Sequence, residues 1–171
     1  SRNPSTTMRS TGEFAVVWQA DGEVKIQRYD ASGVKAGSDT QVNTYATGDQ
    51  ILPVIDLESD GDFVVVWYSN LQDGDGPGIF AQRLTSAGVA TFAEFQVNTY
   101  TTNMQTFPAL DVEPDGDFAV VWQSNLQDGA GNGIFAQRYD SAGTKRGTEF
   151  QANTHTGSSG QAYGDVAHMS T

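Results

Sequence analysis

Cysteine is absent from this chain of 171 residues, which excludes disulfides, thiolate metal sites and thiol nucleophiles. Positive charge is also scarce: nine lysines and arginines stand against 21 acidic residues, for a formal net charge of −12. A surface of this kind repels phosphate backbones and argues against nucleic acid as a partner. No apolar run approaches the ~20 residues that a membrane helix needs, so we expect no membrane insertion.

The chain contains three copies of one sequence repeat. Trp18, Trp67 and Trp122 mark the repeats, at spacings of 49 and 55 residues. They lie in the matching segments GEFAVVWQ, GDFVVVWY and GDFAVVWQ. The spacing differs because units two and three carry the insertions NLQDGDGPG and NLQDGAGNG, where unit one has the short ADGE. A period of this length predicts stacked supersecondary units, none of which can bury its apolar faces alone.

The third unit reads as four strands. Residues 108–113 alternate between apolar and polar and stop at a Pro-Asp-Gly turn, and residues 117–124 are apolar at every central position. Two further strands are predicted at 134–140 and 149–154, and nothing of helical period lies between them. The sequence therefore predicts an all-β fold, a β-propeller-like array of four-stranded antiparallel blades.

The blade boundaries follow from the repeats within a single array over residues 1–171. We place blade one at about 4–49, blade two at about 50–104 and blade three at about 105–160, and we interpret about 161–171 as the first strand of a further blade. Closed propellers usually have about four to eight blades. Three blades and one extra strand therefore favour either self-association or further blades in a longer chain.

The repeated segments, such as DGDFVVVWYS, DGPGIFAQR and EFQVNT in unit two, resemble the tandem repeats of ~50 residues found in secreted bacterial adhesin-like β-propeller proteins. The general character is also similar to FG-GAP and Asp-box propellers, although the Asp-box order S-x-D-x-G-x-x-W is absent. The resemblance implies a surface location, repeat arrays, frequent calcium binding, and adhesion or carbohydrate recognition. Abundant Gly, Ser, Thr, Asn and Asp agree with a secreted or cell-surface protein.

Two glycine-rich loops are candidate calcium sites. Calcium prefers carboxylate, amide and carbonyl oxygens, and glycine lets the backbone wrap around the ion. The candidate ligands are Asp73, Asp75, Asp128 and Asn132. The loops fall short of the EF-hand ligand count and unit one lacks them, so a plain hairpin loop that uses glycine for positive φ is the alternative.

A Gln-Arg pair repeated in each unit is the candidate ligand-binding set: Gln27, Arg28, Gln82, Arg83, Gln137 and Arg138. A cation in the middle of a strand needs a carboxylate or carbonyls when it is buried, so a structural pairing, for instance with an aspartate of a neighbouring blade, is one interpretation. If these side chains face the centre of a ring, they form a polar ring suited to a glycan or an anionic ligand.

Two other repeated features favour structural roles. The acidic cluster Asp56, Glu58, Asp60 and Asp62, echoed by Asp111, Glu113, Asp115 and Asp117, surrounds Asp-Gly dipeptides typical of hairpin turns. The three tryptophans end apolar strands at the same place in every unit, which predicts packing in the core or between blades.

No catalytic residue is predicted. His155 and His168 are not at metal-binding spacing, no G-x-S-x-G motif exists, and the carboxylates follow the repeat. We therefore expect a non-enzymatic extracellular module that binds carbohydrate or another cell-surface ligand. The alternative is a structural subunit that self-assembles into a filament, a sheath or a larger propeller. A glycan-active enzyme comes third, because the two carboxylates of a glycosidase need only meet in space.

Overall fold

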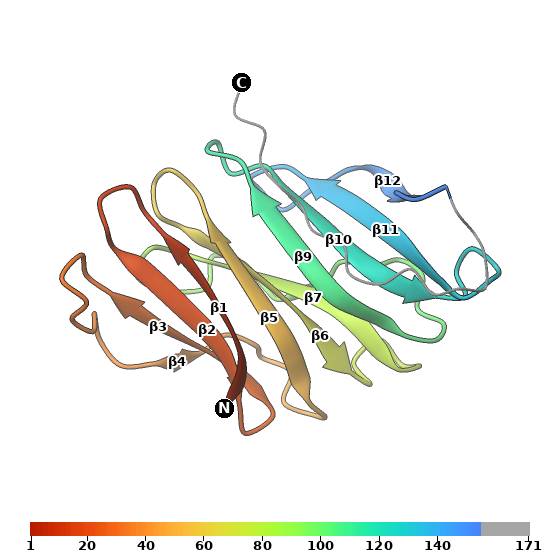
Figure 1. Ribbon diagram of the computed structural model, residues 1–171, viewed down its shortest axis with the longest axis horizontal. Coiled ribbons are helices and arrows are strands. Elements are labelled where there is room, and N and C mark those ends of the chain that lie inside the picture. The colour runs from red at the N-terminus through yellow and green to blue at the C-terminus, as the bar shows by residue number, and fades with distance from the viewer. Residues whose placement is uncertain (155–171) are drawn as a thin grey trace.

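The computed structural model describes residues 1–154. In this part of the chain all regular structure is β, arranged as three four-stranded antiparallel sheets (Figure 1). Each sheet pairs four consecutive strands in sequence order. The predicted all-β fold of four-stranded antiparallel units is confirmed, while the strand expected at about 161–171 lies outside the described residues. None of the described residues forms a helix long and apolar enough to cross a membrane.

The strands follow the repeat. The first sheet contains β1 (Arg2–Met8), β2 (Phe14–Ala20), β3 (Glu23–Tyr29) and β4 (Thr40–Gln41). The second contains β5 (Gln50–Leu57), β6 (Phe63–Asn70), β7 (Pro77–Leu84) and β8 (Phe95–Gln96). The third contains β9 (Gln105–Val112), β10 (Phe118–Asn125), β11 (Asn132–Tyr139) and β12 (Lys145–Gln151).

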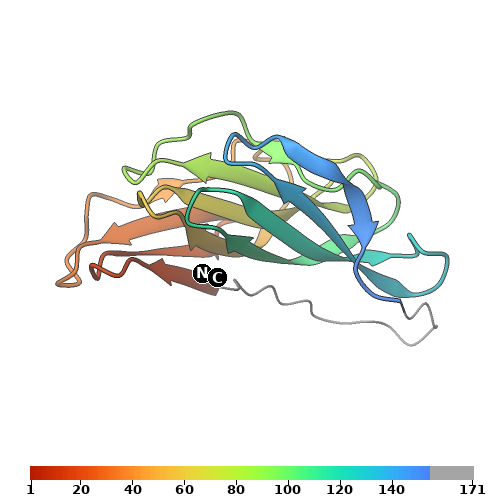
Figure 2. The same ribbon diagram turned by 90° about the horizontal axis from the view of Figure 1, so that it is seen from above.

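The first strands of the three sheets, β1, β5 and β9, lie beside one another, and we call them the axial strands. From this side the sheets fan outward, so that the later strands of each sheet lie progressively farther away (Figure 2). This is the arrangement of neighbouring propeller blades around an axis.

Each sheet has an upstream face toward the preceding sheet and a downstream face toward the following one. Between the first two sheets, Ala15 and Val17 pack against Val65 and Trp67, all with no exposed surface. Residues at the same repeat positions fill the next interface: Val64 and Val66 with Val120 and Trp122. Apolar burial at these two interfaces is the main stabilising contribution.

The open upstream face of the first sheet explains a difference between repeats. In β6 every residue from Phe63 to Trp67 is buried, because this strand is central and covered on both faces. In β2 only the downstream residues are buried, while Val16 and Trp18 are partly exposed. The same sequence pattern therefore gives different burial according to its neighbours.

The observed strand ends also depart from the sequence prediction. Strand β9 begins three residues before the predicted 108, because the backbone of Gln105 continues the ladder opposite Ser124. The equivalent Gln50 begins β5 opposite Ser69, and both glutamine side chains are buried. The fourth strands vary in length: β4 and β8 have only two residues, whereas β12 has seven.

Candidate functional site

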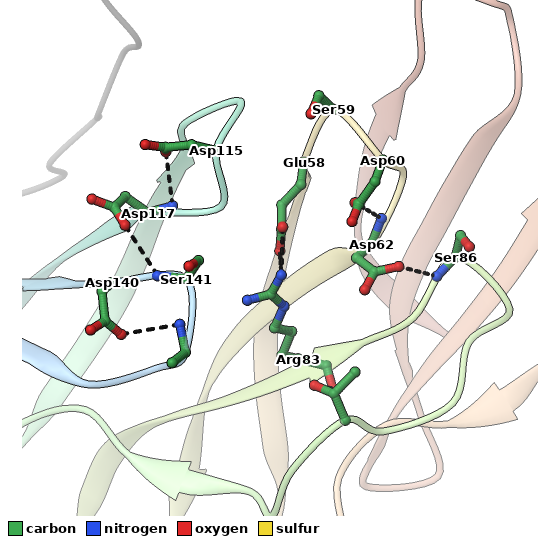
Figure 3. Close-up of polar contacts among 12 residues, drawn as sticks. Glu58, Ser59, Asp60, Asp62, Arg83, Ser86, Asp115, Asp117, Asp140 and Ser141 are labelled. Atoms are coloured by element: carbon green, nitrogen blue, oxygen red, sulfur yellow. Dashed lines mark hydrogen bonds and ion pairs between the residues drawn. The ribbon is translucent and has the colours of Figure 1, made fainter.

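The turns after β5 and β9 gather the acidic side chains at one edge of the sheets (Figure 3). In the second sheet, Asp60 accepts a hydrogen bond from the backbone N–H of Asp62 at 3.0 Å. Asp62 in turn accepts one from Ser86 N–H at 2.8 Å, which ties the β5–β6 turn to the β7–β8 turn. These carboxylates therefore stabilise turns, as the sequence predicted for them.

The third sheet repeats these contacts. Asp115 accepts from the backbone N–H of Asp117 at 3.2 Å, and Asp117 accepts from Ser141 N–H at 3.1 Å. Asp117 also pairs with Arg146, with 2.7 Å between nitrogen and oxygen.

Glu58 differs from the turn carboxylates because it forms a buried ion pair. The Arg83 Nη2 atom lies 2.5 Å from both carboxylate oxygens of Glu58, and the two side chains are only 12% and 5% exposed (Figure 3). Burial raises the pKa of Glu58, an effect that the Arg83 charge opposes and that Asp60 and Asp62 reinforce. The partner of Arg83 is thus a glutamate of its own sheet, not an aspartate of a neighbouring sheet.

The two equivalent arginines have other surroundings. Arg28 donates a hydrogen bond from Nη1 to the carbonyl of Ser86 at 2.9 Å. It lines a cavity of about 160 Å³ together with Arg9, which stands at the repeat position of Glu58. Arg138 is exposed and lines a different cavity. All three lie on the third strand of a sheet, away from the axial strands.

The glutamines beside these arginines are buried and have one repeated role. Each Nε2 donates to the carbonyl of the following arginine and to a carbonyl ten residues further on. These contacts hold the third strand against the connection to the fourth in the first two sheets, and against β12 itself in the third sheet. The residues are Gln27, Gln82 and Gln137, at most 1% exposed.

The predicted calcium ligands accept hydrogen bonds both within their loops and from neighbouring segments. Asp73 accepts from Asp75 N–H at 3.3 Å, and Asp75 accepts from Asn103 N–H at 3.2 Å. Burial raises the pKa of Asp73. Among residues 1–154 no group of three or more His, Cys, Asp or Glu side chains is placed to hold a metal ion.

The loop of the third sheet is similar. Asp128 accepts from Ala130 N–H at 3.2 Å and from Gln151 Nε2 at 2.9 Å, while Asn132 accepts from Asn125 Nδ2 at 2.8 Å. Calcium binding therefore stays a prediction from the sequence.

A carboxylate that the sequence placed only in a turn cluster lies on the axial strand β5. Asp56 accepts three hydrogen bonds: from Thr7 Oγ1 at 3.2 Å, from Leu57 N–H at 2.8 Å and from Val112 N–H at 3.0 Å. These donors come from all three axial strands. Because Val112 follows Asp111, the carboxylate of Asp56 lies beside the residue at its own repeat position in the third sheet.

Asp111 lines a cavity of about 230 Å³ on the third sheet. Glu113, Asp117, Arg138, Tyr139 and Arg146 are also among its lining residues. Carboxylates, two guanidinium groups and an aromatic ring thus line one cavity that extends across the third sheet from β9 to β12, a combination that can bind and orient polyhydroxylated ligands.

Farther along the same strands is an open groove of about 520 Å³. It forms where each axial strand has a bulge that contains a residue of positive φ followed by a proline. The residues are Asn3, Leu52 and Phe107, with φ of 54°, 50° and 54°. Non-glycine residues rarely adopt this conformation, and such strain concentrates at functional sites. The prolines and Phe107 give this groove apolar walls.

Comparisons with known proteins identify the fold. No protein-family model matches the chain, and no curated protein sequence matches it. Solved structures do: an endo-arabinase from Bacteroides thetaiotaomicron aligns over 88% of this chain and 61% of its own, with a TM-score of 0.58 at 12% identity. A thermostable family-43 glycoside hydrolase aligns over 88% and 52%, with a TM-score of 0.57 at 10% identity. A polysaccharide lyase aligns over 87% and 40%, with a TM-score of 0.55 at 11% identity.

These comparisons support the β-propeller-like fold and correct one expectation. The chain spans between two fifths and about three fifths of the length of these structures. The sequence indicated a non-enzymatic module, and this was wrong, because the similar structures are glycoside hydrolases and a lyase.

Proposed function

We propose that this chain is the three-sheet part of a carbohydrate-active enzyme, with the glycan bound along the axial strands. One observation carries the proposal: the Asp56 carboxylate accepts a hydrogen bond from Val112 N–H, so a carboxylate of one axial strand is held against the backbone of the next, one residue beyond Asp111. Glycosidic-bond cleavage typically needs two carboxyl groups on either side of the scissile bond. The fold of glycan-active enzymes supports this interpretation.

The two carboxylates have different surroundings, as an acid–base pair requires. Asp56 is held in one orientation by three donors, which suits a carboxylate that stabilises positive charge. Asp111 faces a cavity that also contains Arg138, and the cavity leaves room for a ligand. We assign the two residues to the reacting end of the glycan.

The groove with the prolines extends the site. Asp56 is three residues beyond Pro53, which corresponds to about 10 Å along a strand. Apolar ring faces of a sugar chain can pack on Pro53, Pro108 and Phe107 while its hydroxyl groups meet the polar end.

The test is an assay of the purified chain on arabinan, xylan and pectin. New reducing ends report hydrolysis, and ultraviolet-absorbing unsaturated ends report elimination. We expect Asp111→Asn to lower the rate by about 100-fold or more. Asp115→Asn, in the exposed turn of the same sheet, is the matched control and should retain the rate.

Binding is measured separately by affinity electrophoresis in the same polysaccharides, because catalysis depends on more groups than binding does. Retarded migration that is lost when Phe107 is replaced by alanine would support the groove. A chain that neither binds nor cleaves any of these glycans contradicts the proposal, as does equal activity of Asp111→Asn and Asp115→Asn.

A further inference from the structure

The upstream face of the first sheet carries an aromatic pair that is also found at the interface between the second and third sheets. Phe14 stacks on Tyr29 with 4.6 Å between ring centroids and 7° between planes. Phe118 stacks on Tyr139 in the same way, at 4.7 Å and 9°, and this second pair is buried against the second sheet. The first pair is only partly buried.

The polar contacts of that interface are also present in part. The Tyr139 hydroxyl and the Lys145 ammonium both donate to the carbonyl of Val97 across the interface, at 3.2 and 3.1 Å. Tyr29 and Lys35 occupy the same positions in the first sheet, and each tyrosine is the antiparallel partner of its lysine. Among the described residues no carbonyl of a preceding sheet receives these two donors.

The downstream face of the third sheet supplies the matching half. At the repeat positions of the buried residues Val64, Val66, Ile79, Ala81 and Val97 it carries Ala119, Val121, Ile134, Ala136 and Ala152. Ala152 replaces Val97, and its N–H bonds the carbonyl of Ile134 at 2.8 Å, as Val97 bonds Ile79 at 2.8 Å. The Ala152 carbonyl therefore occupies the equivalent place in the fold.

A second polar contact has the same form. Glu94 Oε2 accepts from Thr44 Oγ1 of the preceding sheet at 3.0 Å, and Glu149 accepts from Thr99 at 2.9 Å. These positions hold Asp39 on the upstream face of the first sheet and Thr154 on the downstream face of the third, two faces that no other described sheet covers. The two ends of the array therefore carry complementary halves of one interface. The first sheet has the two donors and the carboxylate, the third sheet has the carbonyl and the threonine, and both have apolar surface.

We propose that a second copy of this chain packs the downstream face of its third sheet onto the upstream face of the first sheet. The contact continues the two interfaces within the chain and is heterologous, so it forms a ring or a filament according to whether the rotation closes. It also covers the cavity lined by Asp111, Ala119 and Arg138, so a glycan bound in that cavity should oppose the association. An open cavity of about 370 Å³, lined by Arg2, Pro4, Val16 and Trp18, marks where the partner sheet fits.

One substitution weakens this contact relative to the internal ones. Lys25 stands where the second and third sheets have the buried residues Phe80 and Phe135. The lysine stem covers apolar surface while its ammonium group reaches Gln41 Oε1 at 3.3 Å. The assembly should therefore dissociate on dilution.

The test is light scattering coupled to size exclusion over a range of concentrations. We expect a mass that rises above the 18.3 kDa of one chain as concentration increases. Trp18→Arg and Ala152→Arg each block one face and should each give a monomer. Val34→Arg, in a turn where the side chain is 61% exposed, is the matched control and should associate normally.

Mixing the two blocked variants tests the geometry, because each retains the face that the other lacks. The mixture should form a dimer of two chains and grow no further. Thermal melting of each variant separates a blocked face from a misfolded chain. Tyr29→Phe combined with Lys35→Met should weaken association by about tenfold. A wild-type chain that stays monomeric at every concentration overturns the proposal, as does an Ala152→Arg variant that associates as well as wild type.

Discussion

The guanidinium group of Arg83 and the carboxylate of Glu58 share one buried position between the second and third sheets, with 2.5 Å from Nη2 to each oxygen. The third sheet closes over them: a Cβ at Gly116 would lie 2.5 Å from a Glu58 oxygen. This turn therefore requires glycine for two reasons: position 116 has a positive φ of 89°, and a side chain there would clash with the ion pair.

Breaking this ion pair should destabilise the protein strongly. We expect Arg83→Met to lower the free energy of unfolding by about 3–5 kcal/mol, because it leaves the Glu58 carboxylate buried without its cation. Urea denaturation measures the change. The surface pair of Arg146 and Asp117 is the control, since the Arg146 side chain is 56% exposed and Arg146→Met should cost less than about 1 kcal/mol. Equal losses in the two variants would show that Arg83 acts only through packing.

The same residue predicts a pH dependence. Because burial raises the pKa of Glu58 above its usual 4.5, the folded state holds this proton more tightly than the unfolded chain does. The corresponding stability is fully present below the unfolded pKa and is lost as pH rises through the folded pKa. Glu58→Gln should remove this component from the pH profile of the unfolding free energy. A difference between wild type and variant that stays constant across acidic pH would contradict the assignment.

The interfaces between sheets predict a position where charge is not tolerated. Val120 has no exposed surface and packs in the cluster between the second and third sheets. We expect Val120→Asp to prevent folding, with a cost of at least about 4 kcal/mol for an unpaired buried charge. Circular dichroism and melting are the measurements, and Val34→Asp in an exposed turn should melt like wild type. A soluble Val120→Asp protein with a cooperative melting transition would contradict the burial of Val120 between the second and third sheets.

Calcium binding, expected from the two glycine-rich loops, has its own test. A calcium site at Asp73 and Asp75, or at Asp128 and Asn132, predicts a melting temperature that rises with free calcium by mass action. Combining Asp73→Asn with Asp128→Asn should abolish the rise, whereas Asp140→Asn in a separate turn should not. An unchanged melting temperature at millimolar calcium would leave these loops as hairpin connections held by their own hydrogen bonds.

The sequence predicted the sheets well because the periodicity of the repeat and the burial of the strands have the same cause. Residues Phe63 to Trp67 are apolar at every position, and the strand that they form is covered on both faces. The pairing of side chains was harder to foresee. Arg28 and Arg83 have the same local sequence but different partners, because the position of Glu58 is occupied by Arg9 in the first unit.

The candidate site was missed for a related reason. Asp56 and Val112 are 56 residues apart, and their hydrogen bond depends on how two sheets meet at the axis. From the local sequence we grouped Asp56 with the acidic residues of a turn, because the sequence of a single unit does not show which residues of the neighbouring axial strand it will contact. A signal was nevertheless present: the first unit has Thr7 where the second and third have Asp56 and Asp111.

Residues at the same repeat positions form both interfaces between sheets, and this determines how the chain can gain or lose units. Tandem duplication of one 55-residue unit would place a new sheet between two existing ones and present each with the face that it already contacts. Loss of a unit would likewise rejoin matching faces. Unequal recombination between the repeats can therefore vary the number of sheets in whole units while the packing of every remaining interface is retained.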